Sequence, residues 1–162
     1  MATRRRLWFM IGFALLVGAW FELPALCRGP QSPEDEVRAA IGAVVDGVGR
    51  ADLGAALEPI SARYQDADGL DRTALQALLF RELQARGPVH AVLGPIAVQV
   101  EGEQAQAQFD ALLLSGLNPA ALDLRANEAD AWHFDVELAR EEEDWRIVGH
   151  ERRGVLPQDV LR

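Results

Sequence analysis

At Gly87-Pro88 the spacing of the apolar residues changes from a helical period to an extended one, and this change constrains the fold most. Before this point apolar residues recur every three or four positions; the last such set is Leu75, Leu78, Leu79 and Leu83. After it, apolar and polar residues alternate, as in residues 104–113, which is typical of a strand with one buried face. Helices followed by strands predict an α+β domain, with the helices packed on one face of an antiparallel sheet.

Capping signals set the ends of three predicted helices. Ser32, Asp52 and Asp71 each precede a helical apolar pattern, and their side-chain oxygens can accept hydrogen bonds from the free N–H groups of a first turn. Residues that continue a helix poorly close the three patterns: Gly47 with Gly49, then Pro59, then Gly87 with Pro88. The three predicted helices therefore follow one another directly.

About four antiparallel strands are predicted after Pro88. The first covers residues 89–100, with a break at Gly94-Pro95, and the second covers residues 104–113. The apolar positions of the third and fourth strands are Trp132, Phe134, Val136 and Leu138, then Trp145 and Ile147. The connection from Ser115 to Asp130 is longer than an ordinary hairpin loop. Its leucines at 117, 122 and 124 suit a lid or a partner contact.

In the third predicted strand, His133 and Asp135 alternate with Trp132 and Phe134. Because successive side chains point to opposite faces of a sheet, the two pairs cannot share a face. We expect the aromatic face to lie inward against the helices. The histidine–aspartate pair then belongs to the solvated face of the sheet or to an interface with another chain.

The first 33 residues read as a membrane segment followed by a linker. Residues 1–6 form a basic tail, residues 7–26 are apolar enough for a transmembrane anchor or a signal peptide, and residues 27–33 link them to the domain. The three arginines of the tail place the N-terminus inside the cell. We predict a single-pass anchor in a bacterial cytoplasmic membrane, with the domain outside.

Two alternatives to the anchor stay open. A cleaved signal peptide would release the protein into the periplasm. Lipidation at Cys27 is a third outcome, although Leu26 occupies the position before the cysteine where a small residue is expected. The predicted globular domain covers residues 34–154, and residues 155–162 form a C-terminal tail.

Charge and cysteine content exclude several classes of function. Residues 28–162 carry 13 arginines against 24 acidic residues, a net charge of −11, so this region should repel nucleic acid. Cys27 is the only cysteine, which excludes an internal disulfide and a thiolate metal cluster. Three scattered histidines give no metal-ligand spacing, and we expect neither metal nor cofactor. The acidic run from Glu141 to Asp144 reads as a hairpin turn, because it lacks the pattern of a calcium loop.

Residues 34–153 resemble the nuclear transport factor 2-like, or SnoaL-like, superfamily. The resemblance rests on the order and spacing of four fragments: "GRADL", "ISARYQDADG", "VQVEGEQAQAQF" and "DWRIVGHE". It implies a cone-shaped domain, with a curved sheet around the three helices and a cavity at the wide end. Members include isomerases, cyclases, dehydratases and non-catalytic proteins, so the fold alone does not decide function. The "YQDADGLD" connection departs from the family because it is too short for the usual hairpin, which predicts a reduced wall there.

Candidate site residues follow partly from this resemblance. Relatives use a carboxylate or an Asp–His pair as a general base inside the cone. The candidates for such chemistry are Tyr64, Asp66 and His133, whereas His90 and His150 read as satisfied surface or core residues. The residues expected to line a pocket are Tyr64, Phe109, Trp132, Phe134 and Trp145. For each candidate, packing or turn formation is the competing interpretation.

These observations predict a membrane-anchored, extracytoplasmic binding or interaction domain without catalytic activity. Its partner would be a small apolar ligand or another protein, and the exposed sheet face would suit a homodimer. The alternative is a small isomerase-, cyclase- or dehydratase-like enzyme that abstracts a proton next to a carbonyl inside the cone. In that alternative, Asp66 or His133 is the base and Tyr64 donates a hydrogen bond.

Overall fold

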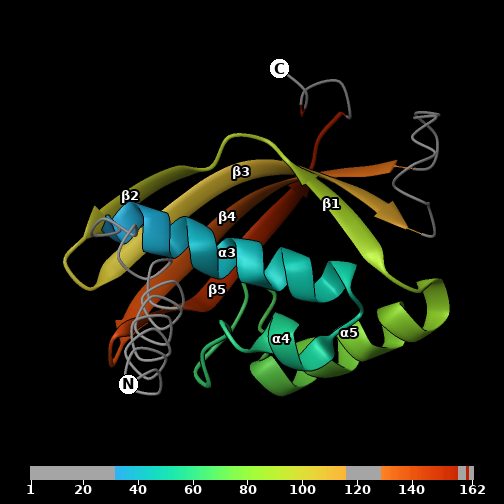
Figure 1. The fold of residues 1–162 in the computed structure, drawn as a ribbon, viewed down its shortest axis with the longest axis horizontal. Helices are drawn as coiled ribbons and strands as arrows, with labels where there is room; N and C mark the ends of the chain where they lie inside the picture. Colours follow the sequence, from blue (N-terminus) through green and yellow to red (C-terminus); the bar gives the residue numbers. More distant parts are fainter. Residues whose placement is uncertain (1–31, 116–128, 157–159, 161–162) are drawn as a thin grey trace, which may run out of the picture. The chain divides into compact units, whose positions relative to one another are not determined.

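The computed structural model describes residues 32–115, 129–156 and 160. Apart from Ser32, these residues belong to one compact unit, Pro33–Arg162. Its helices are α3 (Pro33–Gly49), α4 (Leu53–Leu57) and α5 (Arg72–Arg86). Its strands are β1 (Val89–Leu93), β2 (Ala97–Glu101), β3 (Gln104–Ser115), β4 (Ala129–Glu141) and β5 (Asp144–Gly154). The predicted order of helices followed by strands is confirmed (Figure 1).

Two predicted helix caps are present. The carboxylate of Asp52 accepts a hydrogen bond from the backbone N–H of Ala55 at 3.1 Å, at the start of α4. The carboxylate of Asp71 does the same for the N–H of Ala74 at 2.8 Å, at the start of α5. Gly87 ends α5 with a φ of 75°, a conformation that costs glycine little.

The sheet has five antiparallel strands, and the prediction of about four was therefore wrong. The break at Gly94-Pro95 does more than bend one strand, because it separates β1 from β2. Both strands pair with β3, β1 along its second half and β2 along its first half. The order along the sheet is β1-β3-β4-β5, with β2 beside β3 (Figure 1). Proline cannot donate a backbone hydrogen bond, which favours a strand break at this point.

The face of the sheet that packs on α3, called the inner face below, carries the aromatic residues as predicted. In the ladder between β3 and β4, Phe109 lies opposite Phe134 and Ala105 opposite Leu138. These side chains form one buried core with Val37 and Ile41 of α3 and with Trp145 and Ile147 of β5. His133 and Asp135 accordingly lie on the opposite face, called the outer face.

Helix α5 differs from the prediction, because its leucine stripe is not fully buried. Leu75 and Leu79 pack partly against the core, whereas the neighbouring Phe80 is 55% exposed. The helix is fixed mainly at its start, where the Arg72 guanidinium donates to the carbonyl groups of Leu57 and Ile60 at 3.2 and 3.3 Å. Helix α5 is therefore attached to the C-terminal end of α4 and covers little of the sheet.

Part of the predicted C-terminal tail covers one end of the outer face. Val155 and Val160 pack on three apolar residues that point outward there, called the outer apolar zone below: Leu112, Leu114 and Ala131. The backbone N–H of Val155 donates to the carbonyl of Ala131 at 3.0 Å. The outer face therefore has a covered apolar end and a polar remainder.

Several predictions fall outside the described residues. They concern the membrane segment 7–26, Cys27, and the leucines at 117, 122 and 124. Strands β3 and β4 reach Ser115 and Ala129, so each takes up part of the predicted connection. Within the part of the chain that the structure describes, no helix is long and apolar enough to cross a membrane.

Two glycines of α3 allow a matched test of packing. A Cβ atom added at Gly47 would lie 2.4 Å from the backbone nitrogen of Ala56, whereas one added at Gly42 would meet nothing within 4 Å. We expect Gly47→Ala to lower the free energy of unfolding by about 1–3 kcal/mol, because α3 and α4 must separate. Gly42→Ala should raise it by about 0.5–1 kcal/mol through helix propensity. Urea denaturation of both variants measures the difference, and equal effects would contradict this packing.

Candidate functional site

The segment from Pro59 to Ala67 runs along the free edge of β5. Its backbone is hydrogen-bonded to that strand: the Pro59 carbonyl accepts from the Ile147 N–H at 2.8 Å, and the N–H groups of Ser61 and Gln65 donate to the carbonyls of Ile147 and Val148, each at 2.9 Å. The connection to α5 contains an isolated bridge between Gln65 and Asp71. The segment covers the sheet edge in place of a further strand, and the reduced wall of the cone stays a prediction.

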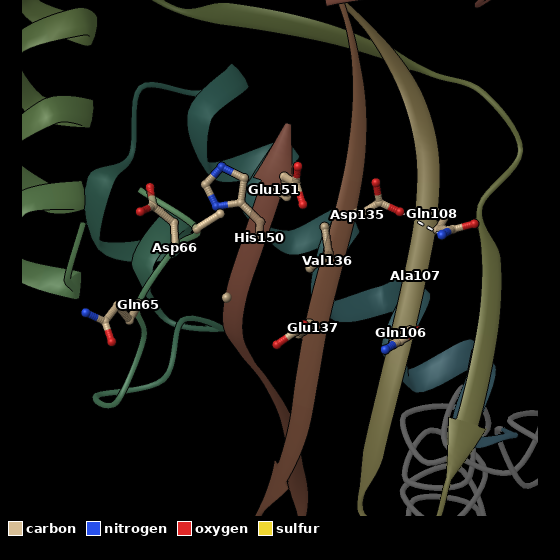
Figure 2. A pocket seen from close by; sticks show the side chains of 12 residues that line it. Gln65, Asp66, Gln106, Ala107, Gln108, Asp135, Val136, Glu137, His150 and Glu151 are labelled. Carbon is tan, nitrogen blue, oxygen red and sulfur yellow. Dashed lines mark hydrogen bonds between the residues drawn. The ribbon is translucent and has the colours of Figure 1, made fainter. Parts of the chain in front are cut away.

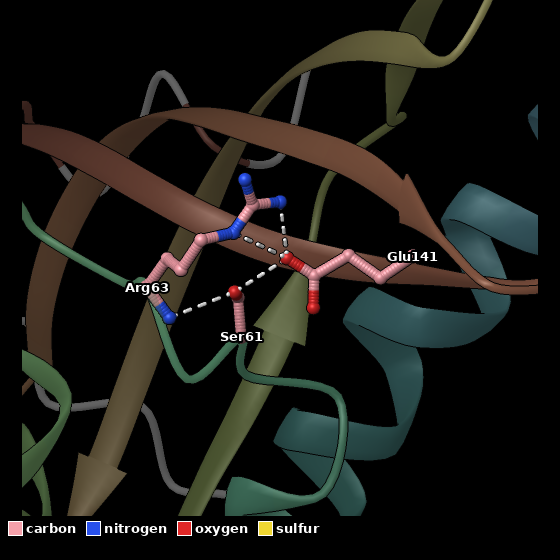
Figure 3. Close-up of polar contacts among 3 residues, drawn as sticks. All are labelled: Ser61, Arg63 and Glu141. Atoms are coloured by element: carbon pink, nitrogen blue, oxygen red, sulfur yellow. Dashed lines mark hydrogen bonds and ion pairs between the residues drawn. The ribbon is translucent and has the colours of Figure 1, made fainter.

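A polar cluster fastens this segment to the end of β4 (Figure 3). One carboxylate oxygen of Glu141 accepts from the Ser61 hydroxyl at 2.7 Å and from the Arg63 guanidinium at 2.7 and 3.1 Å. The Ser61 hydroxyl in turn accepts from the Arg63 backbone N–H at 3.0 Å. The hydrogen bonds from Arg63 and then Ser61 lower the pKa of Glu141. The cluster therefore pairs the Glu141 carboxylate with donors of the segment that follows α4.

A β-bulge decides which side chains of β5 face inward. Leu138 pairs with Ile147 but Glu137 pairs with Gly149, so Val148 is the extra residue. Gly149 permits a close approach at this point, because a Cβ atom there would lie 2.8 Å from the Gln65 carbonyl oxygen. After the bulge, His150 lies opposite Val136, an inner-face residue. The bulge therefore brings His150 to the inner face.

His150 and Tyr64 form a hydrogen-bonded pair on the inner face. The Tyr64 hydroxyl oxygen lies 2.5 Å from His150 Nδ1, and the two rings are stacked with centroids 6.0 Å apart. The Phe134 ring also lies near the imidazole, with the two ring centroids 6.0 Å apart. Sequence reasoning assigned His150 to surface or core without a specific role. The glycine inside the strand at 149 was the signal that could have predicted the bulge.

Burial keeps both members of this pair neutral. It lowers the pKa of His150, against the attraction of Asp66 and Asp68 and with a smaller contribution from Arg152 in the same direction. Burial also raises the pKa of the Tyr64 hydroxyl well above its ordinary range, and Asp66 adds to the rise. A neutral phenol hydrogen-bonded to a neutral imidazole is the arrangement that both shifts favour.

Asp66 has a structural task in the turn that follows Tyr64. Its Oδ1 atom accepts from the backbone N–H of Asp68 at 3.0 Å and of Leu70 at 2.7 Å. This pattern is that of an aspartate shaping its own turn. Asp66 therefore acts on His150 through its charge, and its carboxylate is already hydrogen-bonded to the backbone.

His133 lies on the outer face in a second polar cluster. Its Nδ1 atom is 2.6 Å from Asp110 Oδ1, and its Nε2 atom is 3.5 Å from Asp135 Oδ2. Asp135 also accepts from the Gln108 amide at 2.7 Å and lies 3.6 Å from the Arg153 guanidinium. The outward direction predicted for His133 is confirmed, although its side chain is only 18% exposed. The structure does not bring it together with Tyr64 and Asp66.

Of the five predicted pocket residues, Tyr64, Phe109, Phe134 and Trp145 belong to the core or pack against it, whereas Trp132 does not. Tyr64, Phe109 and Trp145 are buried. Phe134 stacks on Phe109 at 5.4 Å, and Trp132 lies under the Arg152 guanidinium at 5.0 Å. The indole N–H of Trp145 is buried without a hydrogen-bond partner among the described residues. That these residues line a ligand pocket stays a prediction.

An open groove lies on the outer face, and sequence reasoning missed it. It has a volume of about 420 Å³ and runs between residues 65–67 and the outer side chains of β3, β4 and β5. Figure 2 looks onto this groove, with α3 behind the strands. The groove is called the outer groove below. Its polar lining consists of Gln65, Asp66, Gln106, Gln108, Asp135, Glu137, His150 and Glu151. The alternating glutamines of β3 were a visible signal, but only the folded edge segment supplies the wall.

The acidic run at 141–144 forms the expected hairpin turn between β4 and β5. Glu142 sits in this turn with a φ of 59°. His90, the remaining histidine, lies half-buried in β1. Among the described residues, no group of three or more His, Cys, Asp or Glu side chains is arranged so that it could hold a metal ion.

Comparison with known proteins gives a likeness in fold only. No protein-family profile matches the sequence, and no curated protein matches it. Several solved structures are similar. One is a nuclear transport factor 2-like protein with a cystatin-like fold from Novosphingobium aromaticivorans, with a TM-score of 0.59 and 20% identity over 90% of this chain and 95% of that one. Another is a proposed dehydratase of the nuclear transport factor 2-like family from Streptomyces avermitilis, with a TM-score of 0.64 and 16% identity over 78% and 99% of the two chains.

A third similar structure comes from a larger protein of Bdellovibrio bacteriovorus. Its TM-score is 0.63 at 7% identity, with 76% of this chain covered. This chain spans only 41% of the length of that protein. At such identities a likeness speaks for the arrangement of helices and strands and leaves the chemistry of the site open.

The neutral state of His150 predicts a specific pH dependence. Its folded pKa is lowered, so its contribution to stability is complete above the unfolded value of about 6.5 and is lost as the pH falls through the lowered folded value. The loss is about 1.4 kcal/mol for each pH unit between the two values. His150→Asn, which keeps a hydrogen-bonding group near the Nδ1 position without a titratable ring, should flatten this dependence. Urea unfolding from pH 8 to pH 5 measures it, and identical curves for the two proteins would refute the assignment.

Proposed function

Because the described part of this chain has the nuclear transport factor 2-like fold, we propose that it serves as a non-catalytic binding domain whose partner is another protein. The observation that carries this proposal is the placement of the candidate chemical groups. Tyr64 is bonded to His150, Asp66 shapes its own turn, and His133 lies on the opposite sheet face. A general base and its hydrogen-bond donor would have to meet at one point.

The filling of the inner face supports binding over catalysis. The space between α3 and the sheet holds a continuous core that includes Ile41, Phe109, Leu138 and Trp145. A substrate would have to displace packed side chains there, and each large core side chain contributes a few kcal/mol. We therefore place the binding surface on the outer face, where the outer groove is open.

The polarity of the outer groove favours a protein over the apolar ligand considered above. Its lining consists largely of carboxylates and glutamine amides, which an apolar molecule would desolvate without compensation. A peptide segment instead offers main-chain and charged groups that can pair with them. The predicted homodimer through this face stays a prediction, and its repeated carboxylates would repel one another in such a pairing.

The proposed cellular location rests on the sequence. We propose that residues 7–26 hold the domain on the outer side of a bacterial cytoplasmic membrane, because the basic tail precedes the apolar run. Release into the periplasm after signal cleavage is the alternative. The binding domain would then act on proteins of the cell envelope.

One observation favours a second candidate function, a small enzyme that abstracts a proton next to a carbonyl. Tyr64 and His150 form a buried titratable pair on the inner face, and burial shifts the pKa values of both. A substrate would have to open their hydrogen bond. The imidazole resonance of His150 should then move when small carbonyl compounds are added, whereas the binding function predicts no change.

Site-specific photocrosslinking in living cells tests the proposed binding function. Benzoylphenylalanine at Gln106, in the outer groove, should yield a discrete adduct of constant mass. The matched control is the same substitution at Gln84, an exposed glutamine of α5 away from the groove. We expect no adduct there. An adduct at both positions, or at neither, would contradict a partner seated on the outer face.

Membrane fractionation tests the proposed location. The full chain should stay in the membrane pellet after an alkaline wash, because a spanning helix of about 20 apolar residues is not extracted by pH or salt. Mass spectrometry of the purified protein should find the N-terminal peptide intact. A soluble product that lacks residues 1–26 would establish cleavage instead.

A further inference from the structure

The outer groove has a repeat that matches an extended chain. Asp135 and Glu137 are two residues apart on β4 and both line the groove. Side chains at this spacing on a strand are about 7 Å apart. An extended peptide presents its own alternate side chains at the same spacing, so two cations separated by one residue would meet the two carboxylates in register.

A third carboxylate lies beside one of these two and makes that end of the groove more negative. Glu151 lies directly opposite Asp135 in the ladder between β4 and β5. Like charges directly opposite each other on a sheet are destabilising, by about 0.2–1 kcal/mol. Arg153 relieves Asp135 in part, at 3.6 Å. A cation seated between Asp135 and Glu151 would remove the remaining repulsion.

Asp135 is also held in place before any partner arrives. The Gln108 amide donates to its Oδ1 atom at 2.7 Å, a contact drawn in Figure 2, and His133 and Arg153 lie near its Oδ2 atom. An oriented carboxylate binds a guanidinium with less loss of conformational freedom. The exposed amide of Gln106, opposite Glu137, is available for the main chain of a peptide.

The other occupants fit less well. A second copy of this domain, with a net charge of −11 over residues 28–162, would meet the groove with like charge. Phosphate-bearing partners would be repelled for the same reason. The chain's own C-terminal segment covers the outer apolar zone, where Val160 packs on Leu112 and Leu114.

We propose that the outer groove binds an extended segment of a partner protein that carries two arginine or lysine residues separated by one residue. The proposal rests on the binding function above and names the chemistry of its partner. The two cations lie over Asp135 and Glu137, with the first also near Glu151. Residues 65–67 line one side of the groove.

Fluorescence anisotropy with two labelled pentapeptides tests the register. Ser-Arg-Ser-Arg-Ser places both arginines on one side of an extended chain, and Ser-Arg-Arg-Ser-Ser, of equal composition, places them on opposite sides. The full chain, purified in a non-ionic detergent at low ionic strength, should bind the first at least about threefold more tightly, the effect of one exposed ion pair. Equal dissociation constants would overturn the proposal.

Charge-neutralising variants localise the binding. Glu137→Gln and Glu151→Gln should each weaken binding of the alternating peptide by about threefold. Glu103→Gln, an exposed carboxylate in the turn between β2 and β3, should leave it unchanged. Equal effects of the three variants would overturn the proposal, because they would indicate attraction to the net charge only.

The two levels of the proposal can fail separately. If neither peptide binds while the adduct at Gln106 persists, the partner chemistry proposed here is wrong and the binding function stands. If the adduct is missing as well, both proposals fall.

Discussion

The close approach of the Gln65 carbonyl to Gly149 is the constraint on which the site depends. A side chain at 149 would lie 2.8 Å from that oxygen, so only glycine lets the edge segment run against β5. The same glycine follows the bulged residue Val148, which changes the facing of the strand. One small residue therefore permits both the wall of the outer groove and the inward turn of His150.

The titratable groups on the two faces of the sheet differ in charge: those on the inner face are neutral, whereas those on the outer face are charged. On the inner face, burial keeps Tyr64 and His150 neutral beside the aromatic core. On the outer face, Asp135 stays partly exposed and paired with several donors. The backbone of β5 separates these environments, and His150 touches both because it bonds Tyr64 and also borders the outer groove.

Much of the fold could be predicted from local chemistry. Asp52 and Asp71 cap their helices, and the alternation of β3 and β4 fixed the inward facing of Phe109 and Phe134, because both signals act within a few residues. The site was harder to predict, since its parts come from distant segments. Tyr64 meets His150 across 86 residues, and nothing near either residue marks the other. The facing of His150 depends on one inserted residue, which a regular alternation cannot reveal.

The cover over the outer apolar zone has a consequence for the order of folding. Val160 packs on Leu112 and Leu114, which lie far from it along the chain. Such a distant contact closes a long loop, and it gains stability only once the sheet that presents these leucines has formed. The zone is therefore an exposed apolar area of the sheet until the segment after β5 packs on it.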